Sequence, residues 1–272
     1  MHKNGGRQAA VSVWDRVMKD GNSKAERPGR TRADALLQAR GLAESRARAQ
    51  ALIIAGKVMA GDRRVEKPGQ MLASDTPLAL KEPDHPWVSR GGLKLVRALD
   101  HFRIDPSDLV CLDVGASTGG FTDVLLSRGA ARVYAVDVGH GQLAWKLRQD
   151  PRVTVLERTN ARHLTRAEVP EEIGLVVCDA SFIGLEVVLP APLALTGPRA
   201  RLTALIKPQF EVGKGQVGKG GIVRDPALHN DVCARIRSWL AAMGWTVEGV
   251  IDSPIAGQDG NKEFLVAARK DG

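Results

Sequence analysis

The sequence has no apolar run of the roughly 18–20 residues that a membrane-spanning helix needs. Its first residues also lack the apolar core of a secretory signal, so we expect a cytoplasmic protein without stable membrane association. Only three cysteines occur, Cys111, Cys178 and Cys233, and none forms a C-x-x-C pair. We therefore expect reduced, buried thiols. The six histidines form no ligand motif such as H-E-x-x-H, and we predict no metal site.

Acidic residues are outnumbered by basic ones. The chain has 272 residues, with 39 Lys and Arg against 31 Asp and Glu, and a net charge of +8. This surplus indicates a polyanionic partner, nucleic acid before a membrane surface. With 43% hydrophobic residues the chain can form packed cores, and its length suits one large domain and a small one. We expect the protein to be a monomer.

A stretch in the middle of the chain, residues 111–121, has the pattern of a strand, a tight turn and the start of a helix. In a parallel α/β sheet such a turn lies at the carboxyl end of a strand, where ligands bind. Its glycines would let a ligand approach the backbone closely. The spacing of Gly115, Gly119 and Gly120 departs from the dinucleotide fingerprint G-x-G-x-x-G, because Ser117 stands at the middle glycine.

Two acidic residues accompany this turn. Asp113 precedes Gly115 by two residues, and Asp137 ends a second apolar run, where a carboxylate can accept both ribose hydroxyls of a nucleoside. This combination favours S-adenosylmethionine as the cofactor; an NAD site is the main alternative, and a turn that binds nothing is the third. Asn160, after the third strand, could reach the adenine. The residues assigned to the cofactor are Asp113, Gly115, Ala116, Ser117, Thr118, Gly119, Gly120, Phe121, Asp137 and Asn160.

The beginning of the chain has a different character. Residues 1–29 are polar and basic, which predicts a disordered arm. Beyond them we expect two short helices, the first capped by Thr31 and the second capped by Ser45 and ending at Gly56. Short strands are expected over residues 57–60, 64–65 and 78–80.

Three motifs stand out between residues 30 and 81. They are R-x-D-x-L-L from Arg32, R-G-L-A-x-S-R from Arg40 and A-x-x-L-I-x-A-G-K-V from Ala49. Through them this segment resembles an S4 RNA-binding domain, a small α+β fold. Basic side chains on a rigid helix pair suit contacts with RNA phosphates, and a solvated basic face is the alternative. The RNA-contacting residues expected here are Arg30, Arg32, Arg40, Arg46 and Lys57.

The rest of the chain reads as a linker and a large domain. Residues 82–87 contain Pro83 and Pro86, which predicts an interdomain linker. In residues 88–272, apolar strands alternate with helical segments, which predicts an α/β fold with a doubly wound, Rossmann-like parallel sheet. The last two strands have no helix between them, which predicts an antiparallel hairpin at the sheet edge.

A late segment, residues 213–219, nearly matches a P-loop. The residue after Lys219 is glycine, so the hydroxyl that holds magnesium in a P-loop is missing. We interpret the segment as a mobile loop over the active site, in which Lys214 and Lys219 contact phosphates. A plain flexible loop explains the pattern equally well.

Polar residues also stand at the ends of apolar strands. Asp179 and Lys207 each follow a strand, Glu263 starts the last one, and Lys94 lies in the first turn of a helix, where the helix dipole disfavours a cation. If they converge, a lysine with a lowered pKa could remove the proton of a ribose 2′-hydroxyl during methyl transfer. The motif D/N-P-P-Y of amine methylation is replaced by Asp-Ala-Ser-Phe, and no Pro-Cys nucleophile for cytosine C5 is present. Four unrelated surface charges remain the alternative.

Several longer segments carry a wider resemblance. They are Trp-Val-Ser-Arg-Gly-Gly-x-Lys from Trp87, residues 113–121, residues 137–145, residues 156–162 and residues 206–218. Through them residues 30–269 resemble the TlyA family, also labelled hemolysin A, in which an S4 domain precedes an FtsJ-like methyltransferase. The resemblance implies a Lys-Asp-Lys-Glu catalytic set, matched by Lys94, Asp179, Lys207 and Glu263. It also implies 2′-O-methylation of cytidine in ribosomal RNA, on the large subunit and in some members the small one.

Two other functions stay open at this point. One is a non-catalytic S4-type RNA-binding factor of ribosome assembly, against which the intact glycine turn and the four polar residues argue. The other is a membrane-lysing hemolysin, which the absence of a long apolar run disfavours. In either enzymatic or assembly role, the expected partner is ribosomal RNA or a ribosomal subunit.

Overall fold

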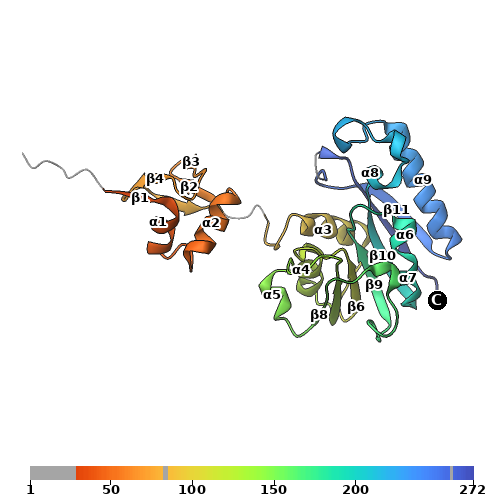
Figure 1. Cartoon of the computed structure of the whole chain (residues 1–272). Helices are drawn as coiled ribbons and strands as arrows, with labels where there is room; N and C mark the ends of the chain where they lie inside the picture. Colours follow the sequence, from red (N-terminus) through yellow and green to blue (C-terminus); the bar gives the residue numbers. More distant parts are fainter. Residues whose placement is uncertain (1–28, 82–84, 258–259) are drawn as a thin grey trace, which may run out of the picture. The chain divides into compact units, whose positions relative to one another are not determined.

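The computed structural model describes residues 29–81, 85–257 and 260–272 (Figure 1). The chain divides into two compact units, Met1–Asp84 and His85–Gly272. Apart from Gly29, the predicted arm lies outside the described residues, and so do residues 82–84 of the predicted linker.

The first unit is a small α+β domain. Its helices are α1 (Ala33–Ala39) and α2 (Arg46–Ile54), and both contribute to a small apolar core. Two short antiparallel sheets complete it, one of β1 (Arg30–Arg32) and β4 (Met71–Ala73), the other in the order β3 (Arg63–Arg64), β2 (Val58–Ala60), β5 (Leu78–Leu80).

The two helix starts test two predictions from the sequence. Ser45 caps α2 as predicted, because its hydroxyl accepts a hydrogen bond from the Arg48 backbone N–H at 3.1 Å. The predicted Thr31 cap is wrong: Thr31 lies in β1, and its hydroxyl contacts Ser74 Oγ at 3.1 Å. The residue before α1 is Arg32, whose side chain makes no capping hydrogen bond. A three-residue strand is too short to show an alternating pattern, so β1 was missed.

A buried carboxylate organises two basic residues of this unit. Asp34 is fully buried and accepts hydrogen bonds from Arg32 Nη2 at 2.8 Å, Arg46 Nε at 3.2 Å and Gln50 Nε2 at 2.9 Å. The Arg32 guanidinium is the main cause that holds the pKa of Asp34 well below its usual range, whereas burial alone would raise it. Both arginine side chains stay about half-exposed, so Asp34 fixes their direction without covering them.

We predict that Asp34→Asn destabilises this unit in a pH-dependent way. Because the folded-state pKa is lowered, the charge of Asp34 contributes stability above its unfolded pKa, about 4, and this contribution is lost as the pH falls towards the folded value. The difference in free energy of unfolding between wild type and variant should therefore be largest at neutral pH and shrink below about pH 4. Urea unfolding of the full chain over this range measures it, and a difference that does not vary with pH would contradict the prediction.

The second unit is a layered α/β domain built on a seven-stranded sheet. The strand order is β11 (Thr246–Asp252), β12 (Phe264–Arg269), β10 (Thr196–Ile206), β9 (Ile173–Cys178), β6 (Val110–Val114), β7 (Arg132–Val136), β8 (Val153–Leu156). Strands from β10 to β8 are parallel, and β12 pairs antiparallel with both β10 and β11. The predicted doubly wound sheet and its final antiparallel pair are confirmed.

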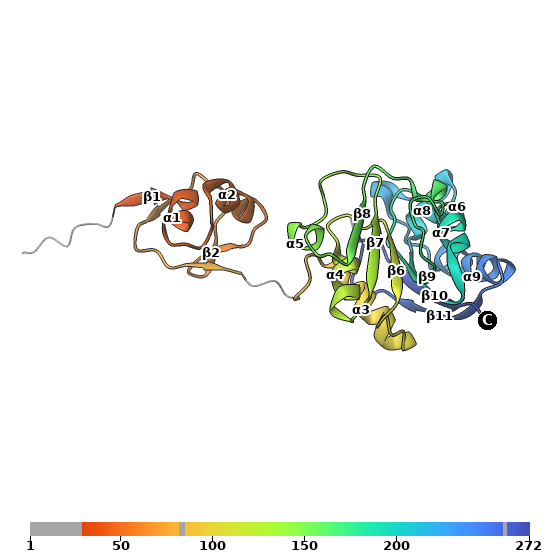
Figure 2. The same ribbon diagram turned by 90° about the horizontal axis from the view of Figure 1, so that it is seen from below.

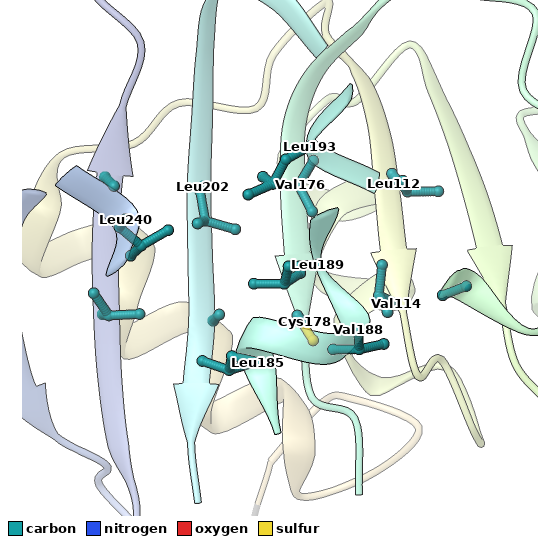
Figure 3. Packing of buried hydrophobic residues seen from close by; sticks show 14 of the residues in the cluster. Leu112, Val114, Val176, Cys178, Leu185, Val188, Leu189, Leu193, Leu202 and Leu240 are labelled. Atoms are coloured by element: carbon teal, nitrogen blue, oxygen red, sulfur yellow. The ribbon is translucent and has the colours of Figure 1, made fainter. Parts of the chain in front are cut away.

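Helices cover both faces of this sheet (Figures 1 and 2). On one face lie α3 (Gly91–Phe102), α4 (Gly120–Ser127) and α5 (Trp145–Arg148), and on the other α6 (Leu185–Val188), α7 (Pro190–Ala194) and α9 (Pro226–Ala242). The short helix α8 (Pro208–Glu211) follows β10 directly. Figure 3 shows how the second face is filled: Leu185, Val188 and Leu193 pack against strand residues such as Val176 and Leu202.

No helix within the described ranges combines the length and the apolarity that crossing a bilayer would require. The helices of the second unit instead bury their apolar faces against the sheet, in two clusters of hydrophobic side chains. These two clusters hold the strands in place, and the loops at the carboxyl ends of the strands carry the polar residues described next.

Candidate active site

Two adjoining cavities lie where the parallel strands end. The first has a volume of about 380 Å³ and the second about 420 Å³, and both are lined by Gly115, Ser117, Asp179 and Ser181. The turn after β6 and the loop after β9 therefore form the boundary between them. Ligands of doubly wound folds bind at this edge of the sheet.

The turn after β6 requires its glycines. Gly115 has φ +84°, and a Cβ there would lie 2.9 Å from the backbone Cα of Ala180. Gly119 has φ +94°, and a Cβ there would lie 2.3 Å from Leu147 Cδ1. A side chain at either position would displace the next loop or the core of α5, so the turn can pass this close to its neighbours only with glycine.

The second cavity contains the two predicted nucleoside contacts. Asp137 accepts hydrogen bonds from the backbone N–H groups of Ser117, at 2.8 Å, and Gly139, at 2.7 Å. Each carboxylate oxygen has one such bond, and each can accept another from a hydroxyl. Asn160 lines the same cavity, where its Oδ1 accepts from the backbone N–H of Arg162. Val138, largely exposed, adds an apolar surface beside them.

Asp113 has surroundings different from those of the other residues assigned to the cofactor. It lines neither cavity, is fully buried, and accepts a 2.6 Å hydrogen bond from Thr122 Oγ1 of α4. Side chains alternate along a strand, so Asp113 faces the same helices as Cys111. Burial raises the pKa of Asp113 to about 7, although the Thr122 hydrogen bond opposes this. Asp113 therefore lies beneath the turn, hydrogen-bonded to α4, and does not face either cavity.

The four residues predicted to converge do so on the wall of the first cavity. Lys94 Nζ donates to Glu263 Oε2 at 2.7 Å and lies 3.5 Å from Asp179 Oδ2. Lys207 Nζ lies 2.6 Å from Asp179 Oδ1, so one carboxylate stands between two ammonium groups. The side chains of both lysines are at most 10% exposed, and Glu263 is buried. Two positive and two negative charges therefore balance within one desolvated cluster.

The prediction missed some residues of this wall. Ser181 accepts a 2.9 Å hydrogen bond from Lys207 Nζ, which also donates to the backbone oxygen of Asp179. Gln209 and Arg90 line the same cavity. These residues could have been found from their positions in the sequence, because each lies within two residues of a member of the cluster or of the N-terminus of α3.

The structure describes most of the residues assigned to RNA. Arg30 and Arg40 donate to backbone oxygens of β4 and of residues 74 and 76, while Lys57 is exposed. In the second unit, residues 213–221 form two short 3₁₀ turns, and Lys219 is exposed but lines neither cavity. Within the described ranges, no group of His, Cys, Asp and Glu side chains is suited to hold a metal ion.

The parallel sheet, the glycine turn and the two cavities at its edge are features of doubly wound folds that bind a nucleotide cofactor, and the match to a methyltransferase family assigns the chain to the S-adenosylmethionine-dependent methyltransferases. Residues 87–270 match the family of FtsJ-like methyltransferases, and residues 31–76 match the S4 domain. The chain belongs to the TlyA family of FtsJ-like methyltransferases, which carry an N-terminal S4 domain.

Individual relatives agree with this assignment. The 16S/23S rRNA (cytidine-2′-O)-methyltransferase TlyA of Mycobacterium tuberculosis is 50% identical over 241 residues, which cover 88% of this chain and 90% of the relative. Hemolysin A of Brachyspira hyodysenteriae is 39% identical, over 86% of this chain and 98% of its own length. A solved structure from Streptococcus thermophilus, named as a candidate hemolysin, is 42% identical with a TM-score of 0.69, covering 90% of this chain and 89% of that one.

We predict that Asp113→Asn changes how stability depends on pH. Because the folded-state pKa is raised to about 7, the protonated form contributes stability at low pH, and this stability is lost as the pH rises from about 4 to 7. Asn stays neutral and can still accept the hydrogen bond from Thr122. The variant should therefore not lose stability over this pH range, and its stability relative to wild type should increase towards pH 8. Thermal unfolding of both proteins at about pH 5 and pH 8 measures the effect. An equal difference at both pH values would show that Asp113 does not titrate in this range.

Proposed function

We propose that this protein transfers the methyl group of S-adenosylmethionine to the ribose 2′-hydroxyl of cytidine in ribosomal RNA. The observation that carries the proposal is the buried cluster of Lys94, Asp179, Lys207 and Glu263 beside the glycine turn. A ribose hydroxyl is a weak nucleophile and must lose its proton as it attacks, which a positioned base assists. The TlyA relative of Mycobacterium tuberculosis is named for this activity on both rRNAs.

The residues of the two cavities fit the cofactor. Asp137 offers one free acceptor position on each carboxylate oxygen for the ribose hydroxyls, and Asn160 lies within reach of the base. Gly115 and Ser117 line both cavities, so a ligand that spans them would have its nucleoside end beside Asp137 and its methionine end beside the turn. When bound there, S-adenosylmethionine supplies a methyl group that is activated by the sulfonium charge.

The cluster has a separate role for each lysine. Lys207, in its neutral amine form, is assigned as the group that receives the proton of the 2′-hydroxyl and becomes an ammonium, with Ser181 and Asp179 holding it in position. Lys94 is held by Glu263 and shares Asp179 with Lys207, so it keeps that carboxylate in place. Desolvation of the whole cluster strengthens these interactions relative to water.

The S4 domain is the part of the chain to which we assign most of the binding of the RNA substrate. We assign binding of ribosomal RNA, free or in a subunit, to Arg30, Arg32, Arg40, Arg46 and Lys57, with Lys214 and Lys219 as further phosphate contacts on the catalytic domain. The half-exposed arginines held by Asp34 support this assignment. We further propose that the protein acts as a cytoplasmic monomer. The domain boundaries proposed are 30–81 for the S4 domain and 88–272 for the methyltransferase.

The reaction can be tested directly. Ribosomal RNA and ribosomal subunits from a strain without the protein would be incubated with purified protein and labelled S-adenosylmethionine. Primer extension at limiting nucleotide and analysis of digested nucleosides should then find 2′-O-methylcytidine. Methyl transfer to a base, or no transfer to either substrate, would refute the proposed function.

Lys207→Arg is the sharpest test of the base. Arginine keeps the positive charge but does not lose its proton near neutral pH. We expect single-turnover methyl transfer to fall by at least about 100-fold, the lower range for general-base catalysis. Calorimetry with S-adenosylmethionine should give an affinity close to that of wild type. Lys270→Arg, beside Trp245 and outside both cavities, is the matched control.

Near-normal transfer by Lys207→Arg would remove the base role from Lys207. The cluster would then act only by orienting the substrate, and the proton would pass to water or to Asp179.

A second prediction concerns RNA binding. Replacing Arg30 and Lys57 together by Ala should weaken binding of ribosomal RNA and reduce the slope of log affinity against log salt by about 1–2, because each phosphate contact releases counterions. Cofactor affinity should not change. The control is Arg128→Ala, which removes a surface cation of the methyltransferase domain, where Arg128 is paired with Asp100. An unchanged salt slope in a filter-binding titration would contradict the assignment of these two residues.

A further inference from the structure

Among the described residues that line the first cavity, one buried side-chain polar atom has neither a hydrogen bond nor an ion pair. Gln209, in α8 directly after Lys207 and Pro208, lines this cavity, and its Oε1 is buried without a hydrogen bond. Of the unpartnered buried side-chain atoms in the described parts of the chain, only those of Gln209 and Asp179 belong to residues of this cavity, and Asp179 has its ion pair with Lys207. A buried acceptor without a donor is costly, so a ligand that donates to it would be bound preferentially.

The strand order indicates which ligand this is. The residues assigned to the cofactor follow β6, β7 and β8, whereas Gln209 follows β10, which is separated from β6 by β9. Neighbouring strands lie about 4.8 Å apart, so Gln209 stands roughly 10 Å from the turn, on the side away from the nucleoside cavity. Lys207 and Glu263 also line the first cavity, and they adjoin β10 and β12, which lie on this same side of β6 in the strand order. This is the half that must admit the nucleotide whose hydroxyl is methylated.

The neighbouring side chains in this half are either paired with one another or apolar. Lys207 Nζ donates a hydrogen bond to Ser181 Oγ. The aromatic ring of Phe210 contacts that of Phe182, with 5.0 Å between the ring centroids. Gln209 is therefore the neutral polar side chain left to recognise a base edge. An amide offers one acceptor and one donor, which matches the amino group and ring nitrogen of cytosine.

Building on the proposed function, we infer that Gln209 selects the base of the target nucleotide, its Oε1 accepting a hydrogen bond from the exocyclic amino group of cytosine. With the amide oriented as in the structure, the carbonyl oxygen that uracil has at this position would face Oε1 with no hydrogen between the two acceptors. A site with a buried group that only the correct substrate satisfies discriminates strongly against the other one. Gln209 thus sets specificity and takes no part in the proton transfer.

The test compares two targets and two variants. Once primer extension has mapped the methylated position, ribosomal RNA or subunits carrying cytidine or uridine there are prepared, in the form that wild type methylates. Single-turnover transfer is measured with wild type, Gln209→Leu and Gln209→Glu. We expect Gln209→Leu, of similar size but without polar atoms, to lower the cytidine-to-uridine rate ratio by about 10- to 100-fold. Gln209→Glu keeps an acceptor and should retain more of the preference.

Controls separate this role from folding and from the reaction itself. Each variant should bind S-adenosylmethionine with wild-type affinity, and Gln149→Ala, an exposed residue outside both cavities, should keep the wild-type ratio. If Gln209→Leu folds poorly, Gln209→Ala is measured in its place. A variant that slows both targets equally, or keeps the wild-type ratio, overturns the inference and leaves the proposed function standing. No ribose methylation by wild type refutes the proposed function, and the inference with it.

Discussion

The Asp179 carboxylate, placed between the side-chain nitrogens of Lys94 and Lys207, is the interaction on which the candidate active site depends. Its partners come from distant parts of the chain: Lys94 from α3, Lys207 from the end of β10, and Glu263 from the loop before β12. A buried charge without its partner is strongly destabilising, so each member needs the others in position. The cluster is thus a constraint on the fold as well as the proposed site of methyl transfer.

The glycine turn supplies the second constraint. Gly115 lies against the loop that contains Ala180, directly after Asp179, so the turn and the cluster share one contact. Gly119 lies against the leucines of the segment that follows Asp137. The turn therefore lies in close contact both with the loop of the cluster and with the segment that follows Asp137, and a side chain at either glycine would displace its neighbour.

The sequence predicted the sheet and the cluster well because both depend on simple patterns. Apolar runs marked the parallel strands, and a polar residue at the end of such a run is brought to the sheet edge by topology alone. The Thr31 cap was wrong because a pairing between residues 31 and 72 overrides local preference, and no local signal reveals it. The surroundings of Asp113 could not be predicted either, because an acid-x-Gly motif is compatible both with an acidic residue that contacts a ligand and with one that is buried beneath the turn.

The position of β12 in the sheet has a consequence for how the protein is made. β12 follows the other strands of the described sheet in the chain but lies inside the sheet, between β10 and β11, and Glu263 directly precedes it. A nascent chain that has emerged only as far as β11 therefore lacks both an interior strand and one carboxylate of the cluster. The interior of the sheet and the four-residue cluster are therefore completed together, when the segment of Glu263 and β12 joins the fold.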